Sequence, residues 1–284
     1  MKNDPLRPEF WKAYAKERDG AQEGRFSSPE FWDKIAEGYD DLEQSPFYRE
    51  MVEEILSTMR QRGALAPQAR VLDVCCGPGN YALRFAPLVK EVVGIDISPK
   101  MLAKFREKAR QKGLQNVKIL LQDWYTFEAQ ETFHTVFVSM TPVLHDLDSI
   151  DRLLALAREF LVLVHWAGVR KNLLYARIWK EIFGREWKWG RPGIIVPFNY
   201  LYTLGYAGDL RFFTGYWERR RPLEKELDHL LWRASHEGIQ VDKEAREKIK
   251  QLLQAEAVDG QVYSRTKVRI GFLLVHIPQR AQPT

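Results

Sequence analysis

Hydrophobic residues along this chain follow two kinds of spacing. Continuous or alternating apolar runs predict strands, and they fall at 70–75, 91–96, 117–121, 135–139 and 160–165. Between these runs apolar residues recur every three or four positions, which predicts helices over 79–89, 98–113 and 150–157. Strands that alternate with helices in this way predict a doubly wound α/β domain with a mostly parallel sheet.

Two helices are predicted before this pattern begins. Ser28 followed by Pro29 indicates a helix start, because a serine hydroxyl can accept from free backbone N–H groups and proline suits the first turn. A second helix is predicted over 46–62 and ends at Gly63. The segment before Ser28 is polar, and we interpret it as an N-terminal arm or short helix.

The part of the chain after residue 166 differs in composition from the rest. Fourteen of the thirty-five aromatic residues lie between Trp166 and Trp217. Aromatic side chains bury large areas, so this stretch is either a lid that shapes a pocket for a planar or apolar ligand, or a dimer interface or second core. Its predicted elements are a helix over 171–183, an irregular loop over 187–192, an aromatic segment at 198–202 and a sixth strand over 210–217.

Two charged amphipathic helices are predicted within 222–257, and a last strand over 268–277. Placing two helices between the sixth and last strands would form an unusual cap. We therefore divide the chain into four segments: an N-terminal arm, 1–27; an α/β core, 28–166; an aromatic-rich cap with the sixth strand, 167–258; and the last strand with the C-terminal tail, 259–284.

The first predicted strand leads into the turn Cys75-Cys76-Gly77-Pro78-Gly79, and a helical pattern follows at once. A strand, a glycine loop and a helix form the first half of a nucleotide-binding βαβ unit. Gly77 and Gly79 allow positive φ and a close approach of the backbone to a ligand. Asp96 ends the second strand, where a carboxylate can accept hydrogen bonds from both ribose hydroxyls.

Two cofactors suit this arrangement. Gly77-x-Gly79-x-x-Ala82 satisfies the dinucleotide fingerprint, which would indicate a nicotinamide oxidoreductase. Asp73, however, lies inside the first strand, where a pyrophosphate loop has no use for another negative charge. A cofactor that carries a sulfonium and an ammonium group does have such a use.

At these residues the chain resembles the class I S-adenosylmethionine (SAM)-dependent methyltransferases of the small-molecule type. Their first motif reads acid-x-Gly-x-Gly-x-Gly, here Asp73-x-Cys75-x-Gly77-x-Gly79, with Cys75 at the first glycine position. The resemblance covers about 28–166 and implies a Rossmann-like, SAM-binding core with a seven-stranded sheet. It implies SAM as the cofactor and S-adenosylhomocysteine as the product.

The resemblance also implies roles for residues outside the motif. Tyr39 would close over the methionine end of the cofactor, and Asp123 would accept from the adenine amino group with Trp124 covering the base. Met101 follows Asp96 closely enough to lie against the adenine. The remaining cofactor-binding candidates are at strand ends: Ile97 and Ser139.

The loop after the fourth strand faces the transferable methyl group in the resembling family. His145 is the nearest candidate general base in it, because neutral imidazole accepts a proton near pH 7. We expect a small-molecule acceptor. RNA and protein acceptors remain alternatives, as does a protein that binds SAM without turnover; the Asn/Asp-Pro-Pro-Tyr/Phe motif of many base-amine methyltransferases is replaced by Ser139-Met140-Thr141-Pro142.

Composition limits these interpretations further. The formal net charge of +5 is spread along the chain and does not indicate a nucleic-acid partner. We interpret the one concentrated basic patch, Arg219-Arg220-Arg221, as solvated. Cys75 and Cys76 are adjacent, which favours free thiols, a reducing cytoplasm and no metal site. No apolar run is long enough to span a membrane and the N-terminus lacks a signal-peptide core, so we expect a cytoplasmic protein.

Overall fold

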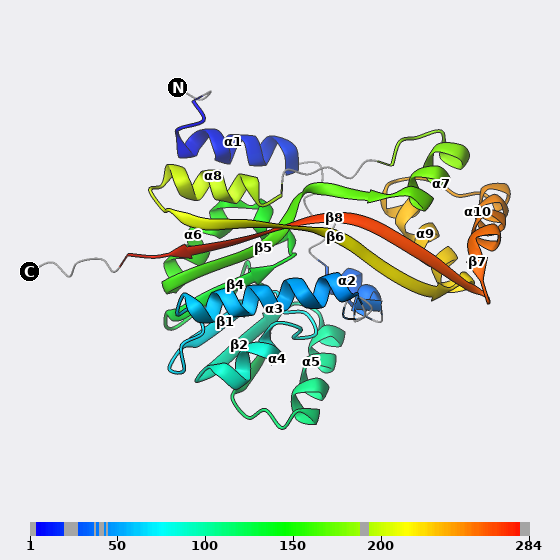
Figure 1. The fold of residues 1–284 in the computed structure, drawn as a ribbon. Helices are drawn as coiled ribbons and strands as arrows, with labels where there is room; N and C mark the ends of the chain where they lie inside the picture. The colour runs from blue at the N-terminus through cyan, green and yellow to red at the C-terminus, as the bar shows by residue number, and fades with distance from the viewer. Residues whose placement is uncertain are drawn as a thin grey trace, which may run out of the picture.

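The computed structural model describes residues 4–19, 28–36, 38–39, 43, 45–187 and 193–278. Its centre is a sheet in the order β3-β2-β1-β4-β5-β8-β6, with the short β7 paired to β8 (Figure 1). Strands β1 to β5 are parallel, and β8 is antiparallel to β5 and β6. The mostly parallel α/β sheet is therefore confirmed. The strands are β1 (Arg70–Val74), β2 (Glu91–Asp96), β3 (Val117–Leu121), β4 (Phe133–Ser139), β5 (Ala157–Asn172), β6 (Gly208–Pro222), β7 (Ala257–Val258) and β8 (Gln261–His276).

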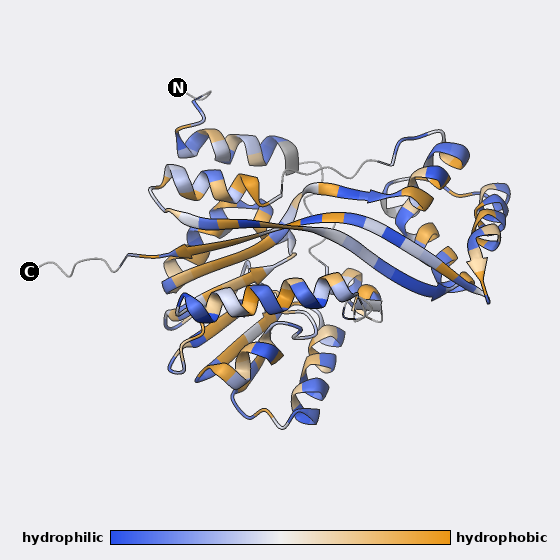
Figure 2. Ribbon diagram, viewed as in Figure 1, coloured by the Kyte–Doolittle hydropathy of each residue, from blue (hydrophilic) through white to orange (hydrophobic). Residues whose placement is uncertain are grey.

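Helices cover both faces of the sheet, because neighbouring strand residues point to opposite sides and both sides are apolar. On one face Val71 and Phe137 belong to a core shared with α3 (Pro46–Gln61), α4 (Ala82–Phe85) and α5 (Pro99–Gln111). On the other, Leu72 and Val136 belong to a core shared with α1 (Pro8–Asp19), α6 (Leu147–Leu156) and α8 (Ile195–Thr203). Figure 2 shows hydrophobic residues filling the central strands between these layers.

Two predicted serine caps are present. The Ser28 hydroxyl accepts from the Phe31 N–H at 3.2 Å and starts α2 (Pro29–Ile35). The Ser98 hydroxyl accepts from the Met101 N–H at 3.1 Å and starts α5. The helix predicted over 79–89 is shorter: α4 ends at Phe85 and a 3₁₀ turn, η2 (Ala86–Leu88), follows. Pro87 lies inside that turn and has no N–H to continue the helix.

Three strands are much longer than the sheet interior requires. The outer parts of β5, β6 and β8 project away from the core and carry α7 (Leu173–Phe183), α9 (Leu223–His236), α10 (Lys243–Glu256) and β7 (Figure 1). We call these outer strand parts with α7, α9, α10 and β7 the cap. It has its own apolar cluster, which includes Ile178, Trp179, Leu227, Leu230, Ile249 and Leu253. Helices α9 and α10 stand between β6 and β8 in the chain, where the apolar spacing predicts them.

The predicted ends of three long strands were wrong. The sixth strand, predicted over 210–217, spans Gly208–Pro222. The fifth strand does not stop at His165 but reaches Asn172, and the last strand begins at Gln261 rather than Val268. The pairing of β5 with β8 shifts register between Trp166 and Arg170. Beyond this irregularity the strands leave the buried sheet, so charged residues replace the apolar run on which the prediction depended.

The aromatic segment 198–202 lies in helix α8, which packs with α1 and α6 on the outer face of the sheet, away from the cap (Figure 1). Its Tyr200 hydroxyl donates to Asp151 at 2.6 Å, and Lys12 of α1 pairs with the same carboxylate at 2.7 Å. The loop predicted over 187–192 lies, apart from Trp187, outside the described residues. Within the described part of the chain, no helix combines the length and the apolar character that a membrane crossing needs.

Candidate functional site

The glycine loop joins β1 to α4. Gly77 and Gly79 have φ of +54° and +76°, the left-handed values expected for glycine. A Cβ on Gly79 would lie 2.4 Å from the Phe105 ring of α5, so this glycine allows the helix to pack. A Cβ on Gly77 would meet only the Met101 Sδ and Tyr39 Cε1, each at 4.0 Å. Tyr39 and Met101 therefore border the loop at Gly77.

Cys75, which stands at the first glycine position of the resembling motif, has a left-handed backbone conformation. Its φ is +55°, a value that residues with a Cβ adopt at an energetic cost. Burial, followed by the charge of Asp96, raises the pKa of its thiol to about 12, while a hydrogen bond with Thr141 acts in the opposite direction. The thiol is therefore protonated at neutral pH. Cys76 is buried beside it and packs against Gly94 of β2.

Asp96 connects the end of β2 to the glycine loop. One carboxylate oxygen accepts from the Gly77 N–H at 2.8 Å, and the other accepts from the Ser98 N–H at 2.8 Å. The side chain is buried, and burial raises its pKa, although these backbone N–H groups act in the opposite direction. Each oxygen keeps a second lone pair that could accept from a ligand hydroxyl.

Asp73 and Tyr39 lie close to this carboxylate. Asp73 is 3% exposed in β1, and burial and then the charge of Asp96 raise its pKa well above the usual range. The pKa of Tyr39 is raised by burial and then by Asp96 and Asp73. A cationic ligand beside these two buried carboxyl groups would favour their ionised forms, so this end of the site suits a positive charge.

The other cofactor candidates lie at the same edge of the sheet in different surroundings. Ile97 is half-buried after β2, and Asp123 accepts from the Tyr125 N–H at 2.9 Å after β3. The Trp124 ring is buried in the core, where its indole N–H donates to Ser149 at 2.8 Å. Tyr125, which the sequence did not single out, is 54% exposed at this edge.

A cavity of about 1140 Å³ opens from the glycine loop toward the cap. Of the predicted residues, those that line it are Tyr39, Asp73, Cys75, Ser139 and His145. His145 lies in the turn η3 (Pro142–His145), and its ring centroid is 4.7 Å from that of His165 in β5. The other predicted site residues are not among those that line the cavity: Gly77, Gly79, Asp96, Ile97, Met101, Asp123 and Trp124.

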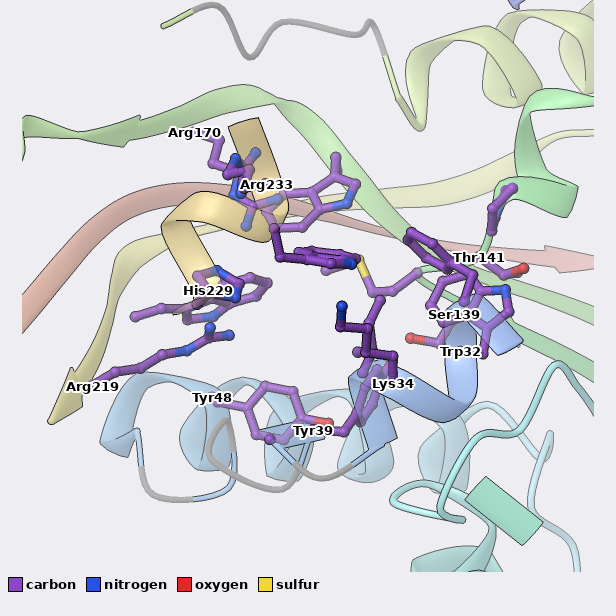
Figure 3. A pocket seen from close by; sticks show the side chains of 18 of the residues that line it. Trp32, Lys34, Tyr39, Tyr48, Ser139, Thr141, Arg170, Arg219, His229 and Arg233 are labelled. Atoms are coloured by element: carbon purple, nitrogen blue, oxygen red, sulfur yellow. The ribbon is translucent and has the colours of Figure 1, made fainter. Parts of the chain in front are cut away.

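The cap supplies the other end of this cavity. Trp166 and Trp217 lie there with ring centroids 4.8 Å apart, at an interplanar angle of 64°. Figure 3 shows Arg170, Arg233, His229 and Arg219 gathered at one end, and Ser139 and Thr141 at the other. Burial, and then the charges of Arg221, Arg233, Arg219 and Arg170, lower the pKa of His229 to about 2.

Sequence reasoning missed the residues at this end. The interpretation of Arg219-Arg220-Arg221 as solvated holds for Arg220, which is exposed, but Arg219 and Arg221 are half-buried, and all three line the cavity. No sequence pattern identified Arg170, His229 and Arg233 as site residues, because they come from β5 and α9 and meet only in the folded structure. Alternation along the sixth strand could have indicated that Trp217, Arg219 and Arg221 share one face.

Residues 71–163 match the family described as methyltransferase domain. Among curated relatives, the 23S rRNA (uracil(1939)-C(5))-methyltransferase of Shewanella sediminis is 37% identical over 70 residues, 25% of this chain and 16% of that protein. The corresponding enzyme of Xanthomonas campestris is 42% identical over 57 residues, 20% of this chain and 13% of that protein. The chain thus spans a small fraction of these relatives.

Solved structures resemble nearly the whole chain. Magnesium protoporphyrin IX methyltransferase from Synechocystis, crystallised with S-adenosylhomocysteine, has a TM-score of 0.50 at 18% identity, covering 94% of this chain and 99% of that one. An N-methyltransferase from Bradyrhizobium japonicum, also with S-adenosylhomocysteine, has a TM-score of 0.51 at 16% identity, covering 87% and 98%. Likeness at this identity shows a shared fold.

The matched domain and the order of the strands in the sheet indicate the same fold. The antiparallel β8 inserted between β5 and β6 distinguishes this sheet from the parallel order of dinucleotide-binding folds. Together they identify residues 71–163 as a methyltransferase domain and show that the chain shares the fold of these two methyltransferases.

Proposed function

We propose that this protein transfers the methyl group of SAM to a small organic molecule that binds in the cavity between the glycine loop and the cap. One observation carries the proposal: a single cavity has Asp73 and Tyr39, which lie beside the glycine loop, at one end and the cap helices at the other. Its volume of about 1140 Å³ is slightly larger than the roughly 300–1,000 Å³ of pockets that hold one drug-sized ligand.

The residues at the glycine loop suit the cofactor. Asp73 and Asp96 would favour its ammonium and ribose groups, and Tyr39 would cover its methionine end. The Asn80 side chain is buried, and its amide nitrogen has no hydrogen-bond partner among the described residues. That nitrogen lies in a residue of the cavity wall and could donate to a carboxylate. When bound, SAM supplies an electrophilic methyl group.

The chain's own contribution to the chemistry is mainly positioning. The cavity walls would hold the acceptor atom near the methyl carbon and exclude water, which can supply much of the rate enhancement. An acceptor hydroxyl or acidic carbon also needs a base, and His145 is the candidate within the wall. Its imidazole would accept the proton as the acceptor forms its bond to carbon.

The small-molecule proposal has an RNA alternative, raised by the similarity to rRNA methyltransferases. The two matches cover only 16% and 13% of those enzymes. An RNA substrate also needs basic side chains on an open surface. Here Arg233 is 8% exposed and lines the cavity.

The cofactor is tested by thermal unfolding with S-adenosylhomocysteine, SAM and NAD added separately. A ligand at one hundred times its dissociation constant adds about 2.7 kcal/mol, which for this length raises Tm by roughly 5–10 °C. We expect this shift with both sulfur nucleosides and none with NAD. A shift with NAD alone would remove the proposal.

Catalysis is tested by incubating the protein with SAM carrying a labelled methyl group. The acceptors offered are a low-molecular-mass metabolite extract and, separately, total RNA. We expect label in the small-molecule fraction. Label in RNA would favour the alternative, and cofactor binding without transfer to either would support a protein that binds SAM without turnover.

A further inference from the structure

The cap end of the cavity contains an unusual concentration of positive charge. Of the described side chains that line the cavity, eight are Lys or Arg and four are Asp or Glu. Arg170 comes from β5, Arg219 and Arg221 from β6, and Arg233 from α9. Three separate elements therefore direct guanidinium groups toward one end, as Figure 3 shows for Arg170, Arg219 and Arg233.

Two of the acids near this cluster also interact with other groups. Glu226 lies 3.5 Å from Arg221 and accepts from the Tyr175 hydroxyl at 2.6 Å. Glu237 lies 3.4 Å from Arg233 and accepts from the Trp179 indole at 2.7 Å. Burial, and then the neighbouring Arg233 and Arg219, lower the pKa of Arg170 well below its usual range. Among the described side chains that line the cavity, cations therefore outnumber acids, and burying such an excess of charge is costly.

Aromatic rings form the wall beside this charge. The Arg170 guanidinium lies 4.6 Å from the Trp166 ring centroid, and Trp166 packs against Trp217. Trp217 is 5% exposed, and its indole N–H has no hydrogen-bond partner among the described residues. A buried donor in a cavity wall normally finds an acceptor. The wall thus offers flat apolar surface, a free donor and several cations.

We propose that the methyl acceptor is an organic anion, whose carboxylate or phosphate binds Arg170, Arg219 and Arg233 while its planar or apolar body lies against Trp166 and Trp217. This inference depends on the proposed function. The body then extends from the cap toward Ser139, Thr141 and His145, where the cavity approaches the glycine loop. The acid group serves to anchor and orient, because guanidinium forks bind carboxylate and phosphate in fixed geometry.

The transfer balances with a separate acceptor atom. A nucleophilic oxygen, nitrogen, sulfur or carbon of the acceptor forms a bond to the methyl carbon. The carbon–sulfur bond breaks, and its electron pair returns to sulfur. A proton lost by the acceptor goes to His145 or to solvent.

The test compares matched probes in the presence of saturating S-adenosylhomocysteine. Indole-3-acetate and phenyl phosphate carry the acid group, whereas indole-3-acetamide and phenol are their neutral counterparts. Binding is followed by calorimetry and by quenching of tryptophan fluorescence, since Trp166 and Trp217 line the cavity. We expect at least one anionic probe to bind about ten times more tightly than its neutral counterpart, or better. Equal affinities, or no binding of either anion at millimolar concentration, would overturn the inference.

A pair of variants locates the anion. Arg219→Gln removes one cation of the cluster and should weaken the anionic probe about 10- to 100-fold, the range for a hydrogen bond to a charged group. Arg265→Gln is the control: it lies on the neighbouring β8, pairs with Glu218 at 3.2 Å and is not among the residues that line the cavity. It should leave probe affinity unchanged. Equal losses in both variants would refute the site.

Three further results keep the two proposals distinguishable. Both variants should bind S-adenosylhomocysteine like the unaltered protein. If the unaltered protein does not bind S-adenosylhomocysteine, the proposed function fails. The probe comparison, made without S-adenosylhomocysteine, then still decides whether the cavity prefers an anionic ligand. A short RNA that binds more tightly than the anionic probes, with equal losses in Arg219→Gln and Arg265→Gln, would overturn the inference in favour of a surface-bound nucleic acid. The probe comparison needs no variant, so it decides the question even if Arg219→Gln does not fold.

Discussion

The glycine-loop end of the cavity and its cap end differ in charge and in the way the chain builds them. Asp73 and Asp96 near the first end are buried carboxyl groups within one βαβ unit, and Asp96 accepts from backbone N–H groups of adjacent turns. Arg170 and Arg233 at the second end come from a strand and a helix that are far apart in the sequence. The first end is thus a local structure, and the second is assembled by the tertiary fold.

The difference in sign suits a reaction with two ligands of opposite charge. Buried carboxylates favour a cationic donor at the glycine loop, and buried guanidinium groups favour an anionic acceptor at the cap. Each ligand would be disfavoured at the other's end, so the charge pattern would orient both. The four predictions below test that contrast, beginning with the largest expected effect.

Replacing His145 should affect turnover alone. If His145 is the base, His145→Ala should lower the rate of methyl transfer about 10²-fold or more, and affinity for S-adenosylhomocysteine should remain. The rate is measured with the acceptor that the labelled-methyl experiment identifies. His276→Ala, at the exposed end of β8, is the control and should be unaffected. Unchanged turnover in His145→Ala would mean that the acceptor needs no base from this residue.

Asp96→Ala should damage the glycine-loop end in two ways. The N–H groups of Gly77 and Ser98 lose their acceptors, which should lower the free energy of unfolding by about 2–4 kcal/mol. Cofactor affinity should also fall, by about 1–3 kcal/mol if the ribose hydroxyls bind here. Urea unfolding and calorimetry measure the two losses.

A matched control for that variant lies in the cap. Asp242 caps α10 by accepting from the Ala245 N–H at 2.8 Å, so Asp242→Ala should cost about 0.5–2 kcal/mol of stability. Its cofactor affinity should not change. If Asp96→Ala loses stability but binds the cofactor normally, the ribose assignment is wrong.

Acid should destabilise the cap end through His229. The folded protein holds the pKa of this imidazole at about 2, compared with 6.5 in the unfolded chain. Between these values the unfolded state binds more protons, so stability falls as pH decreases below 6.5. From pH 6.5 to 5 we expect a loss of about 1–2 kcal/mol, absent in His229→Asn.

The glycine-loop end responds to acid in the opposite direction. The raised pKa values of Asp73 and Asp96 mean that their carboxylates gain protons more readily in the folded state, which favours folding at low pH. The difference between the unfolding profiles of the unaltered protein and His229→Asn therefore isolates the cap contribution. Profiles that run parallel from pH 6.5 to 5 would show that His229 is not held neutral.

The smallest effects concern Cys75. A β-branched residue tolerates positive φ poorly, so Cys75→Val should lower the free energy of unfolding by about 1–3 kcal/mol. Cys75→Gly relieves the strain but increases the backbone entropy of the unfolded chain, so the net change in stability should stay within about 1 kcal/mol. Thermal unfolding measures both. If valine is tolerated as well as glycine, the left-handed conformation at this position is not required.

The sequence alone predicted the structural features that depend on neighbouring residues. The glycine loop, the serine caps of α2 and α5 and the inner strands of the sheet were predicted because each depends on residues a few positions apart. The carboxylates Asp73 and Asp96 were found for the same reason. Loop, strand and helix follow one another without interruption, so spacing alone placed these groups at one edge of the sheet.

The cap end was decided by the tertiary structure. The outer parts of strands β5, β6 and β8 project from the core and lose the apolar run that identified the strands, so their true lengths were not visible in the pattern. The aromatic stretch also divides in space: Trp166 and Trp217 line the cavity, whereas Tyr200 packs with α1 on the other face. The charge of Arg170, Arg219 and Arg233 became a feature of the site only when antiparallel pairing and helix packing brought them together, because no local rule relates residues so far apart in the chain.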